Sequence, residues 1–302
     1  MVGILTVFGA TGKQGGSVVR TILSHPTLSA QYKVRAVTRD PSKPAAEALK
    51  TQGVEVVKAD LNDKDSVHKA VEGSQAVFGV TDFWSVVSKD GEIAQGNNIA
   101  DACKAAGVEH FIWSSLAHAS KVSGGKLAHM HHFDSKAEVE EFTRSLGVPA
   151  TFFYAGAYMS NIPGALQKNG DEYTLAWNLE PGVKMPLFDA DDTGKFVSGI
   201  LLQSSKLLGQ RVFGATDWYT PDQVVSTIEK VSGKKATYQA LPDEVFKGFL
   251  PPLMAEELTE TLIFMREYAY YGPEAEEGVK QSLQILDQKP TTLEQFFQKT
   301  DL

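Results

Sequence analysis

Short apolar runs alternate with amphipathic stretches through the first half of the chain. Runs rich in β-branched and aromatic residues predict six strands, near residues 4–8, 33–38, 54–59, 76–81, 110–114 and 150–154. Helical periodicity predicts helices between them, near residues 17–23, 45–51, 92–106 and 134–146. Because the strand runs are apolar on both faces, helices are expected to cover both sides of the sheet. The pattern predicts an α/β fold with a doubly wound parallel sheet.

The rhythm changes in the second half, where Gly, Pro and Asn cluster over residues 156–170. Two helix starts are predicted there, at residues 220–223 (TPDQ) and 291–294 (TTLE). In each, a threonine hydroxyl caps the first helical turn and a later polar side chain reaches back to it. A helical pattern over residues 192–203 and a short apolar run over residues 211–214 precede the first of these helix starts.

These changes predict how the chain divides into domains. We expect one domain over residues 1–155 and a smaller, mainly helical part over residues 156–302. Segments near 184–203 and 211–216 are expected to return to the first domain, so the two parts are interleaved rather than joined by a linker.

Composition and charge narrow the class of protein. The chain has 302 residues, 42% of them hydrophobic, and a net charge of −8. The acidic balance argues against direct nucleic-acid binding, and no apolar run approaches the roughly 18–20 residues that span a bilayer. Cys103 is the sole cysteine, which excludes an internal disulfide and a cysteine-based zinc site. We expect a cytoplasmic protein without a signal peptide, and nuclear import stays open.

A glycine motif follows the first predicted strand and precedes the first helix. Its residues are Gly9, Ala10, Thr11, Gly12, Lys13, Gln14 and Gly15. Gly9 permits a tight turn, Gly12 lets the backbone approach a pyrophosphate, and Gly15 lets the helix pack closely on the strand. The anion then lies at the positive end of the helix. We predict a dinucleotide site that uses Gly9, Thr11, Gly12, Lys13, Gln14 and Gly15; a purely structural turn is the alternative.

The end of the second predicted strand indicates which dinucleotide binds. An acidic residue there favours NAD, because it accepts hydrogen bonds from the ribose and repels a 2′-phosphate. Thr38 occupies that position and Arg39 follows it, with Lys43 close by. A guanidinium clamps a phosphate with paired, charge-assisted hydrogen bonds, so we predict NADP (NADPH), with NAD possible as the alternative.

After the third strand, Asp60 and Leu61 fit a contact with the adenine edge of the cofactor. Asp60 has a second interpretation, as the cap of the helix that begins near Lys64.

Together these residues resemble the NmrA-like family of atypical short-chain dehydrogenases. The matching segments are residues 7–16, 37–40, 113–115, 133–136, 139–140, 147–149 and 154–158. The resemblance implies a Rossmann fold, NAD(P) binding, and sensing of the cofactor state by a regulator with a protein partner. It also implies that Thr81 and Phe83 lie near the nicotinamide, that Lys136 lies near its ribose, and that Tyr154 lines the inner end of the cleft.

Ordinary short-chain dehydrogenases carry Tyr-x-x-x-Lys, which places both side chains on one helix face. Lys136 is present here, but His132 stands where the tyrosine would be, and the serine is either Ser114 or Ser115. His132 could act as the acid, because histidine titrates near neutrality. Lys136 alone could be the base, as in related isoflavone-reductase-like enzymes, or it could only hold the ribose.

Two functions are therefore compatible with the sequence. The first is an NADP-binding sensor or regulator with a protein partner. The second is an NADPH-dependent reductase of a small carbonyl or quinone-like substrate. The missing tyrosine favours the first, and the oligomeric state is left open.

Histidines cluster at His118, His129, His131 and His132. His129 and His132 can share a helical face, but the neighbouring sequence offers no carboxylate pair to complete a metal site, so we expect none. A mobile loop over residues 123–126 and a core or interface role for the aromatic run Phe264, Tyr268 and Tyr271 are expected.

Overall fold

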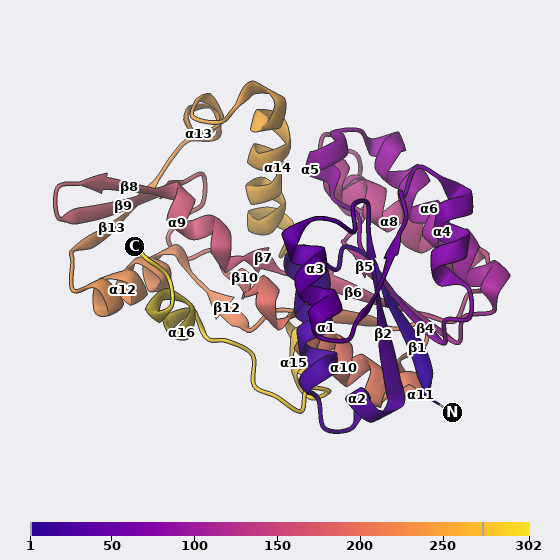
Figure 1. Ribbon diagram of the computed structural model, residues 1–302. Helices are drawn as coiled ribbons and strands as arrows, with labels where there is room; N and C mark the ends of the chain where they lie inside the picture. Colours follow the sequence, from indigo (N-terminus) through magenta and orange to yellow (C-terminus); the bar gives the residue numbers. More distant parts are fainter. Residues whose placement is uncertain (1, 274) are drawn as a thin grey trace.

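Seven parallel strands form the centre of the computed structural model, which describes residues 2–273 and 275–302 (Figure 1). Every paired neighbour in this sheet runs in the same direction. From one edge to the other the strands are β11 (Arg211–Gly214), β6 (Ala150–Ala155), β5 (His110–Ser115), β4 (Ala76–Gly79), β1 (Gly3–Val7), β2 (Tyr32–Thr38) and β3 (Glu55–Lys58). The strand order reverses between β1 and β4, which is the switch point of a Rossmann fold. The predicted fold class is confirmed.

Helices cover both faces of the sheet, as the apolar strand runs predict. One face is packed by α1 (Lys13–Ser24), α3 (Pro44–Thr51) and α10 (Thr193–Leu202), whose buried residues share one apolar cluster with β1. The other face is packed by α4 (Lys64–Val71), α6 (Lys89–Ala106) and α8 (His131–Ser145). Shorter helices connect these layers: α2 (Leu28–Gln31), α5 (Phe83–Val86), α7 (Ala119–Val122) and α11 (Ser204–Leu207).

The second part of the molecule lies beside the sheet and contains two small sheets as well as helices (Figure 1). One sheet joins β12 (Asp217–Tyr219), β10 (Met185–Phe188) and β7 (Ala157–Tyr158); the other joins β13 (Ala236–Ala240), β9 (Glu172–Trp177) and β8 (Leu166–Asn169). Its helical segments are η1 (Met159–Asn161), α9 (Ile162–Ala165), α12 (Pro221–Ser232), α13 (Asp243–Gly248), α14 (Pro252–Tyr268) and α16 (Leu293–Gln298). The hydrophobic pattern predicted the helices better than these short strands.

Local capping explains where several helices begin and end. Thr220 caps α12 and Gln223 returns the bond, which completes the predicted capping box. Gly107 ends α6 in the left-handed conformation, with φ of 66°. The predicted box at residues 291–294 was one residue early, because Thr292 and Gln295 cap α16.

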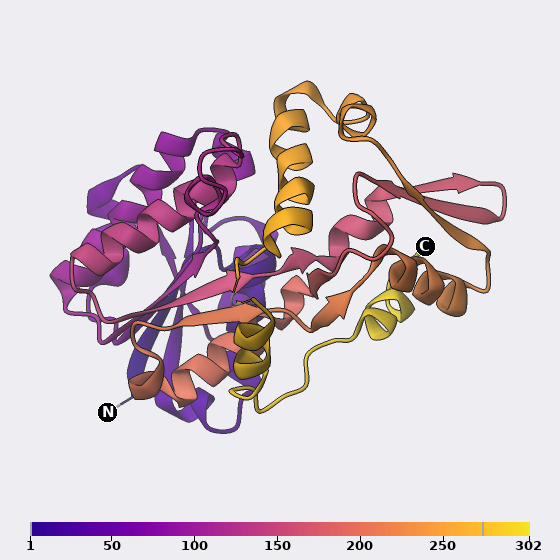
Figure 2. The same cartoon turned by 180° about the vertical axis from the view of Figure 1, so that it is seen from behind.

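The chain crosses between the two parts more than once (Figure 2). After β10 in the small sheet, η2 (Ala190–Asp192) and α10 return to pack against α1. The chain then adds β11 to the central sheet, leaves for the second part, and returns as α15 (Ala275–Leu283) against β11.

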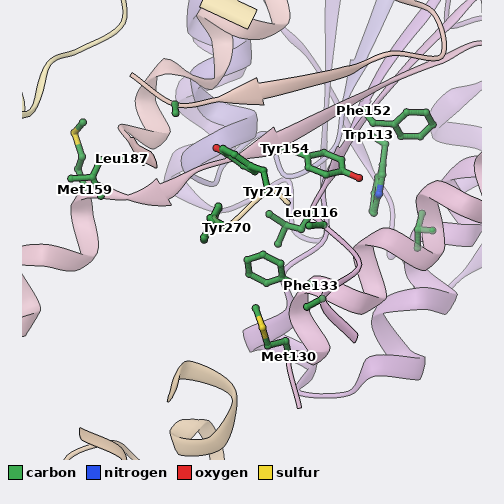
Figure 3. Packing of buried hydrophobic residues seen from close by; sticks show 14 of the residues in the cluster. Trp113, Leu116, Met130, Phe133, Phe152, Tyr154, Met159, Leu187, Tyr270 and Tyr271 are labelled. Atoms are coloured by element: carbon green, nitrogen blue, oxygen red, sulfur yellow. The ribbon is translucent and has the colours of Figure 1, made fainter. Parts of the chain in front are cut away.

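One hydrophobic core runs through both parts (Figure 3). Phe133 of α8 packs against Tyr270 with ring centroids 5.3 Å apart, and against Phe264 of α14 at 5.7 Å. Phe264 and Tyr271 are buried, which agrees with the expected core or interface role, whereas Tyr268 is only half-buried. Within residues 2–273 and 275–302, none of the helices has the length and apolar character needed to cross a membrane.

Candidate dinucleotide site

The glycine turn between β1 and α1 has the geometry that an anion site requires. Gly9 adopts a φ of 64°, and the N–H of Gly12 donates to its carbonyl at 2.8 Å. A side chain at Gly15 would overlap the backbone of Gly9. Gly12 precedes α1 and has no side chain to cap it, so the N–H groups of the first turn are left for a ligand. These features fit a pyrophosphate.

In the turn that follows β2, the acidic side chain is hydrogen-bonded within the turn, whereas the basic side chains are exposed to solvent. The carboxylate of Asp40 accepts two hydrogen bonds from Ser42, at 3.0 Å from the backbone and 2.6 Å from the hydroxyl. These bonds lower the pKa of Asp40. Arg39 is exposed and, among the described residues, has no ion-pair partner. Its guanidinium is therefore available to a 2′-phosphate, as is the exposed ammonium of Lys43.

Asp60 follows β3 but does not cap the next helix. Asp63 caps α4 by accepting from the backbone of Asp65 and Ser66. The Asp60 carboxylate instead accepts two bonds from Asn62, at 2.9 and 3.0 Å. The capping alternative was wrong because the chain makes a further turn before α4. The adenine contact of Asp60 and Leu61 stays a prediction.

Two polar side chains of the glycine motif, those of Lys13 and Gln14, reach into the second part. Lys13 donates to the hydroxyl of Ser160 at 2.9 Å, and Gln14 donates to the hydroxyl of Tyr158 at 2.6 Å. The amide oxygen of Gln14 accepts from Ser114 at 2.8 Å. Burial raises the pKa of Tyr158, so this phenol stays protonated. Gln14 thus links the ends of β1, β5 and β7.

The structure separates the two candidate serines. Ser114 faces Gln14, whereas Ser115 donates to the buried carboxylate of Glu140 at 2.8 Å. Tyr154 donates to the same carboxylate at 2.8 Å, and burial raises its pKa. Its hydroxyl is therefore engaged with α8, and the cofactor contact predicted for Tyr154 stays a prediction.

The side chain of Lys136, on α8, extends to the end of β4. Its ammonium forms a buried ion pair there with Glu92 of α6. The ammonium also donates to the hydroxyl of Thr81 at 3.2 Å, and that hydroxyl donates to Glu92 at 2.7 Å. Ser135 donates to the other carboxylate oxygen of Glu92. The sequence interpretation missed Glu92, because nothing in its helical surroundings marks it as buried. Lys136 is a fixed cation beside Thr81, and its contact with the nicotinamide ribose stays a prediction.

His132 lies one helical turn before Lys136. Its ring packs against α5, which follows Thr81 in the chain. Its ring centroid is 6.0 Å from that of Phe83 and 5.3 Å from that of Trp84. Its Nδ1 lies 2.6 Å from the carboxylate of Glu257, which belongs to α14. Glu257 is also absent from the sequence-derived site, because it is 125 residues away along the chain.

Folding brings carboxylates of α14 next to the histidine cluster. Ligand atoms of His129, Glu256 and Glu260 lie within 4.8 Å of one another. Glu256 is paired with Lys247, and Glu260 accepts from both the backbone and Nδ1 of His129. The sequence spacing did not show these acids because α14 supplies them. The absence of a metal stays a prediction.

A surface hollow of about 540 Å³ lies away from the glycine loop. It is lined by residues of α14, α7, β12 and nearby loops, among them Val122, Trp218, Met265 and Tyr268. It contains none of the residues predicted to bind the cofactor.

The strand order and the glycine turn define a Rossmann-type α/β protein. The NmrA-like family model matches residues 1–297, so the chain belongs to the NmrA-like family, as its motifs predicted. An NmrA-like family domain-containing oxidoreductase of Aspergillus hancockii is 31% identical over 295 residues, covering 91% of this chain and 86% of that protein.

Two solved structures share the fold. The chain matches NmrA, a negative transcriptional regulator in complex with NADP, with a TM-score of 0.85 at 23% identity, covering 99% of this chain and 95% of that one. It matches an NADPH-dependent quinone oxidoreductase of Escherichia coli, complexed with NADPH, with a TM-score of 0.75 at 23% identity, covering 97% and 98%.

Proposed function

We propose that this protein binds NADP(H) and acts as a regulator whose second part responds to cofactor occupancy. Cofactor binding is supported by the uncapped start of α1, by the unpaired guanidinium of Arg39 among the described residues, and by Lys136 beside Thr81. The NmrA regulator with the same fold was solved with NADP bound.

The observation that carries the regulatory role is the attachment of α1 to the second part and to the chain that returns from it. Lys13 and Gln14 bind Ser160 and Tyr158, which follow β6. Further along α1, Ser17 donates to the carbonyl of Asp191 at 2.5 Å and Arg20 pairs with its carboxylate at 2.8 Å. The helix that would bind the pyrophosphate, α1, is therefore attached to residues 158–160 and to Asp191. A movement of α1 on cofactor binding would affect these segments.

A ligand shifts a conformational equilibrium only if it binds one state better than the other. The Lys13 ammonium can bind Ser160 or a pyrophosphate, and the second is the stronger partner. NADP(H) would draw Lys13 away from Ser160 and loosen residues 157–161. A protein partner that recognises this segment would then distinguish the bound and free forms.

Hydrogen exchange with and without NADPH tests this coupling. We expect altered protection at residues 157–161 in addition to the glycine loop. Ser160→Ala removes the competing partner, and should lower the Kd for NADPH about 2–10-fold, which corresponds to one ordinary hydrogen bond. Ser145→Ala is the matched control, because that hydroxyl makes only a local bond to Phe142. Unchanged exchange and an unchanged Kd for Ser160→Ala would overturn the proposal.

A second candidate function is NADPH-dependent reduction of a small carbonyl or quinone-like compound. Its support is that His132 and Lys136 both contact the 81–84 segment, where the nicotinamide is expected. The Aspergillus relative is described as an oxidoreductase.

NADPH oxidation, followed by its absorbance with a panel of quinones and aldehydes, tests this activity. The double variant Lys136→Met/Glu92→Leu removes the cation without leaving an unpaired buried charge, and should abolish turnover. No turnover by the natural chain with the entire panel would remove the reductase candidate.

A further inference from the structure

We propose that Glu257 and His132 form a proton-donating dyad, in which Glu257 positions the ring and His132 serves in place of the missing tyrosine. The inference rests on the second candidate function, reduction of a carbonyl compound. The dyad joins α14 of the second part to α8 of the Rossmann part (Figure 1).

Glu257 holds His132 at two points. One carboxylate oxygen lies 2.6 Å from the backbone nitrogen of His132 and 2.6 Å from Nδ1 of its ring. Met130, which precedes α8, has no side-chain oxygen to cap the helix, so Glu257 supplies this cap from another part of the chain. A carboxylate is also favoured at the positive end of a helix. Backbone and ring are therefore fixed together.

The pairing decides which ring nitrogen is free to react. Nδ1–H donates to Glu257, which leaves Nε2 as the site of proton exchange. Within residues 2–273 and 275–302, no hydrogen bond engages Nε2. The ring lies between Trp84, Phe83 and Phe133, with centroid distances of 5.3, 6.0 and 4.8 Å. The side chain is 14% exposed, which allows exchange of a proton with solvent.

This arrangement suits an aromatic aldehyde or ketone. Trp84 is partly exposed and its ring offers a flat apolar face beside His132. Bound NADPH would supply the hydride to the carbonyl carbon. The C=O π pair then moves to oxygen, which takes the proton from Nε2 of the imidazolium. The ring is left neutral, the Glu257 carboxylate keeps its hydrogen bond, and a solvent proton restores the imidazolium.

The preceding turn provides an internal control. Glu260 binds the backbone nitrogen of His129 at 2.8 Å and its Nδ1 at 2.6 Å, which repeats the contacts of Glu257. The His129 side chain is 54% exposed, and its ring neighbour is His131 rather than the 81–84 segment. The two pairs dock α14 in the same way, but only one of them faces the predicted nicotinamide.

The test compares kcat, KM and the Kd for NADPH in the full chain and its variants, with the most active carbonyl compound of the panel. His132→Gln should lower kcat about 100-fold or more, as expected for loss of a general acid. Glu257→Gln should lower kcat about 10-fold or more, as for loss of an orienting partner, with KM and Kd within twofold of the natural chain. Glu257→Asp should restore part of the loss.

The pH dependence separates positioning from mere support of the fold. Loss of the carboxylate makes the imidazolium less stable, so in Glu257→Gln the alkaline fall of kcat should move to lower pH. Other charged or titratable groups on the elements around His132 include Lys136 with Glu92, Asp82 before α5, Glu256 and Glu260 on α14, and the neighbouring His129 and His131; all are unchanged in this variant. Glu260→Gln should weaken the docking of α14 to a similar degree without moving this profile.

The outcomes are distinguishable. An active natural chain whose Glu257→Gln variant loses no more kcat than Glu260→Gln, or keeps the same pH profile, would overturn the dyad alone. A natural chain that binds NADPH but reduces no member of the panel would overturn the reductase function and the dyad with it.

Discussion

Glu92 and Lys136 form a largely buried ion pair at the end of β4. The Glu92 side chain is fully buried and that of Lys136 is 11% exposed. Glu92 also accepts hydrogen bonds from Thr81 and Ser135, so its oxygens are satisfied. The pair fixes a positive charge where the nicotinamide ribose is expected, and it is stable only while both partners are present.

Glu92→Leu should therefore destabilise the protein by about 3–5 kcal/mol, because it leaves the Lys136 ammonium buried without a counter-charge. Urea denaturation measures this change. Lys136→Met in the Glu92→Leu background should recover most of the loss. The exposed pair Lys230–Glu294 is the control, and Lys230→Ala should cost about 0–1 kcal/mol. Equal losses for the two single variants would contradict the buried pair.

Arg39→Ala should weaken NADPH binding about 10–100-fold, the value of a charge-assisted phosphate contact, and change NADH binding little. Titration calorimetry with both cofactors measures the difference. Lys50→Ala is a suitable control, because this exposed cation pairs with Glu47 instead. An equal loss of affinity for NADPH and for NADH would show that Arg39 does not bind the 2′-phosphate.

Gly15→Ala should lower the affinity for NADPH and the free energy of unfolding together. Its Cβ would overlap the Gly9 carbonyl, which forces the glycine turn to move, at a cost of about 1–3 kcal/mol. Gly248→Ala tests the general effect of adding a methyl group, because nothing lies within 4 Å of that position in α13. A Gly15→Ala variant that binds NADPH normally would show that the helix does not need this close approach.

Stability should fall in mild acid because of His110 in β5. Burial lowers the pKa of His110 from 6.5 to about 4, so the unfolded chain binds a proton more readily than the folded chain. The stabilisation is complete above pH 6.5 and is lost as the pH falls toward 4, by about 3 kcal/mol in total at 1.36 kcal/mol per unit.

Urea denaturation midpoints of the natural chain and of His110→Gln, measured between pH 7.5 and 4, check this prediction. This pH range covers the change in the pKa of His110 from 6.5 to about 4. The variant should show a shallower dependence over the same window. Identical slopes would mean that His110 does not bind a proton differently in the two states.

Much of the fold could be predicted from the sequence, because local pattern and local structure agree in the Rossmann part. The apolar runs became β1 to β6, and the short run at residues 211–214 became β11. Short strands such as β9 were missed. Their exposed faces break the apolar pattern. β9 pairs locally with β8, but it also depends on β13, which lies far along the chain.

The site could be predicted only where a motif lies on one stretch of chain. The glycine turn and the Arg39 turn are of this kind. Glu92 and Glu257 are not, because each carboxylate becomes part of the site through helices that meet in the folded chain. A buried acid looks the same as a surface acid in a sequence. Gln14 was placed in the site, but its bonds to Ser114 and Tyr158 required the structure.

The position of β11 limits how this protein could be divided or recombined. β11 completes the edge of the central sheet beside β6, although it follows the first passage through the second part. A fragment that ends near residue 155 would leave the edge of β6 open to pairing with other chains. The nucleotide-binding half is therefore not a transferable cassette, and exchanges between homologous genes should preserve function only when both halves are inherited together.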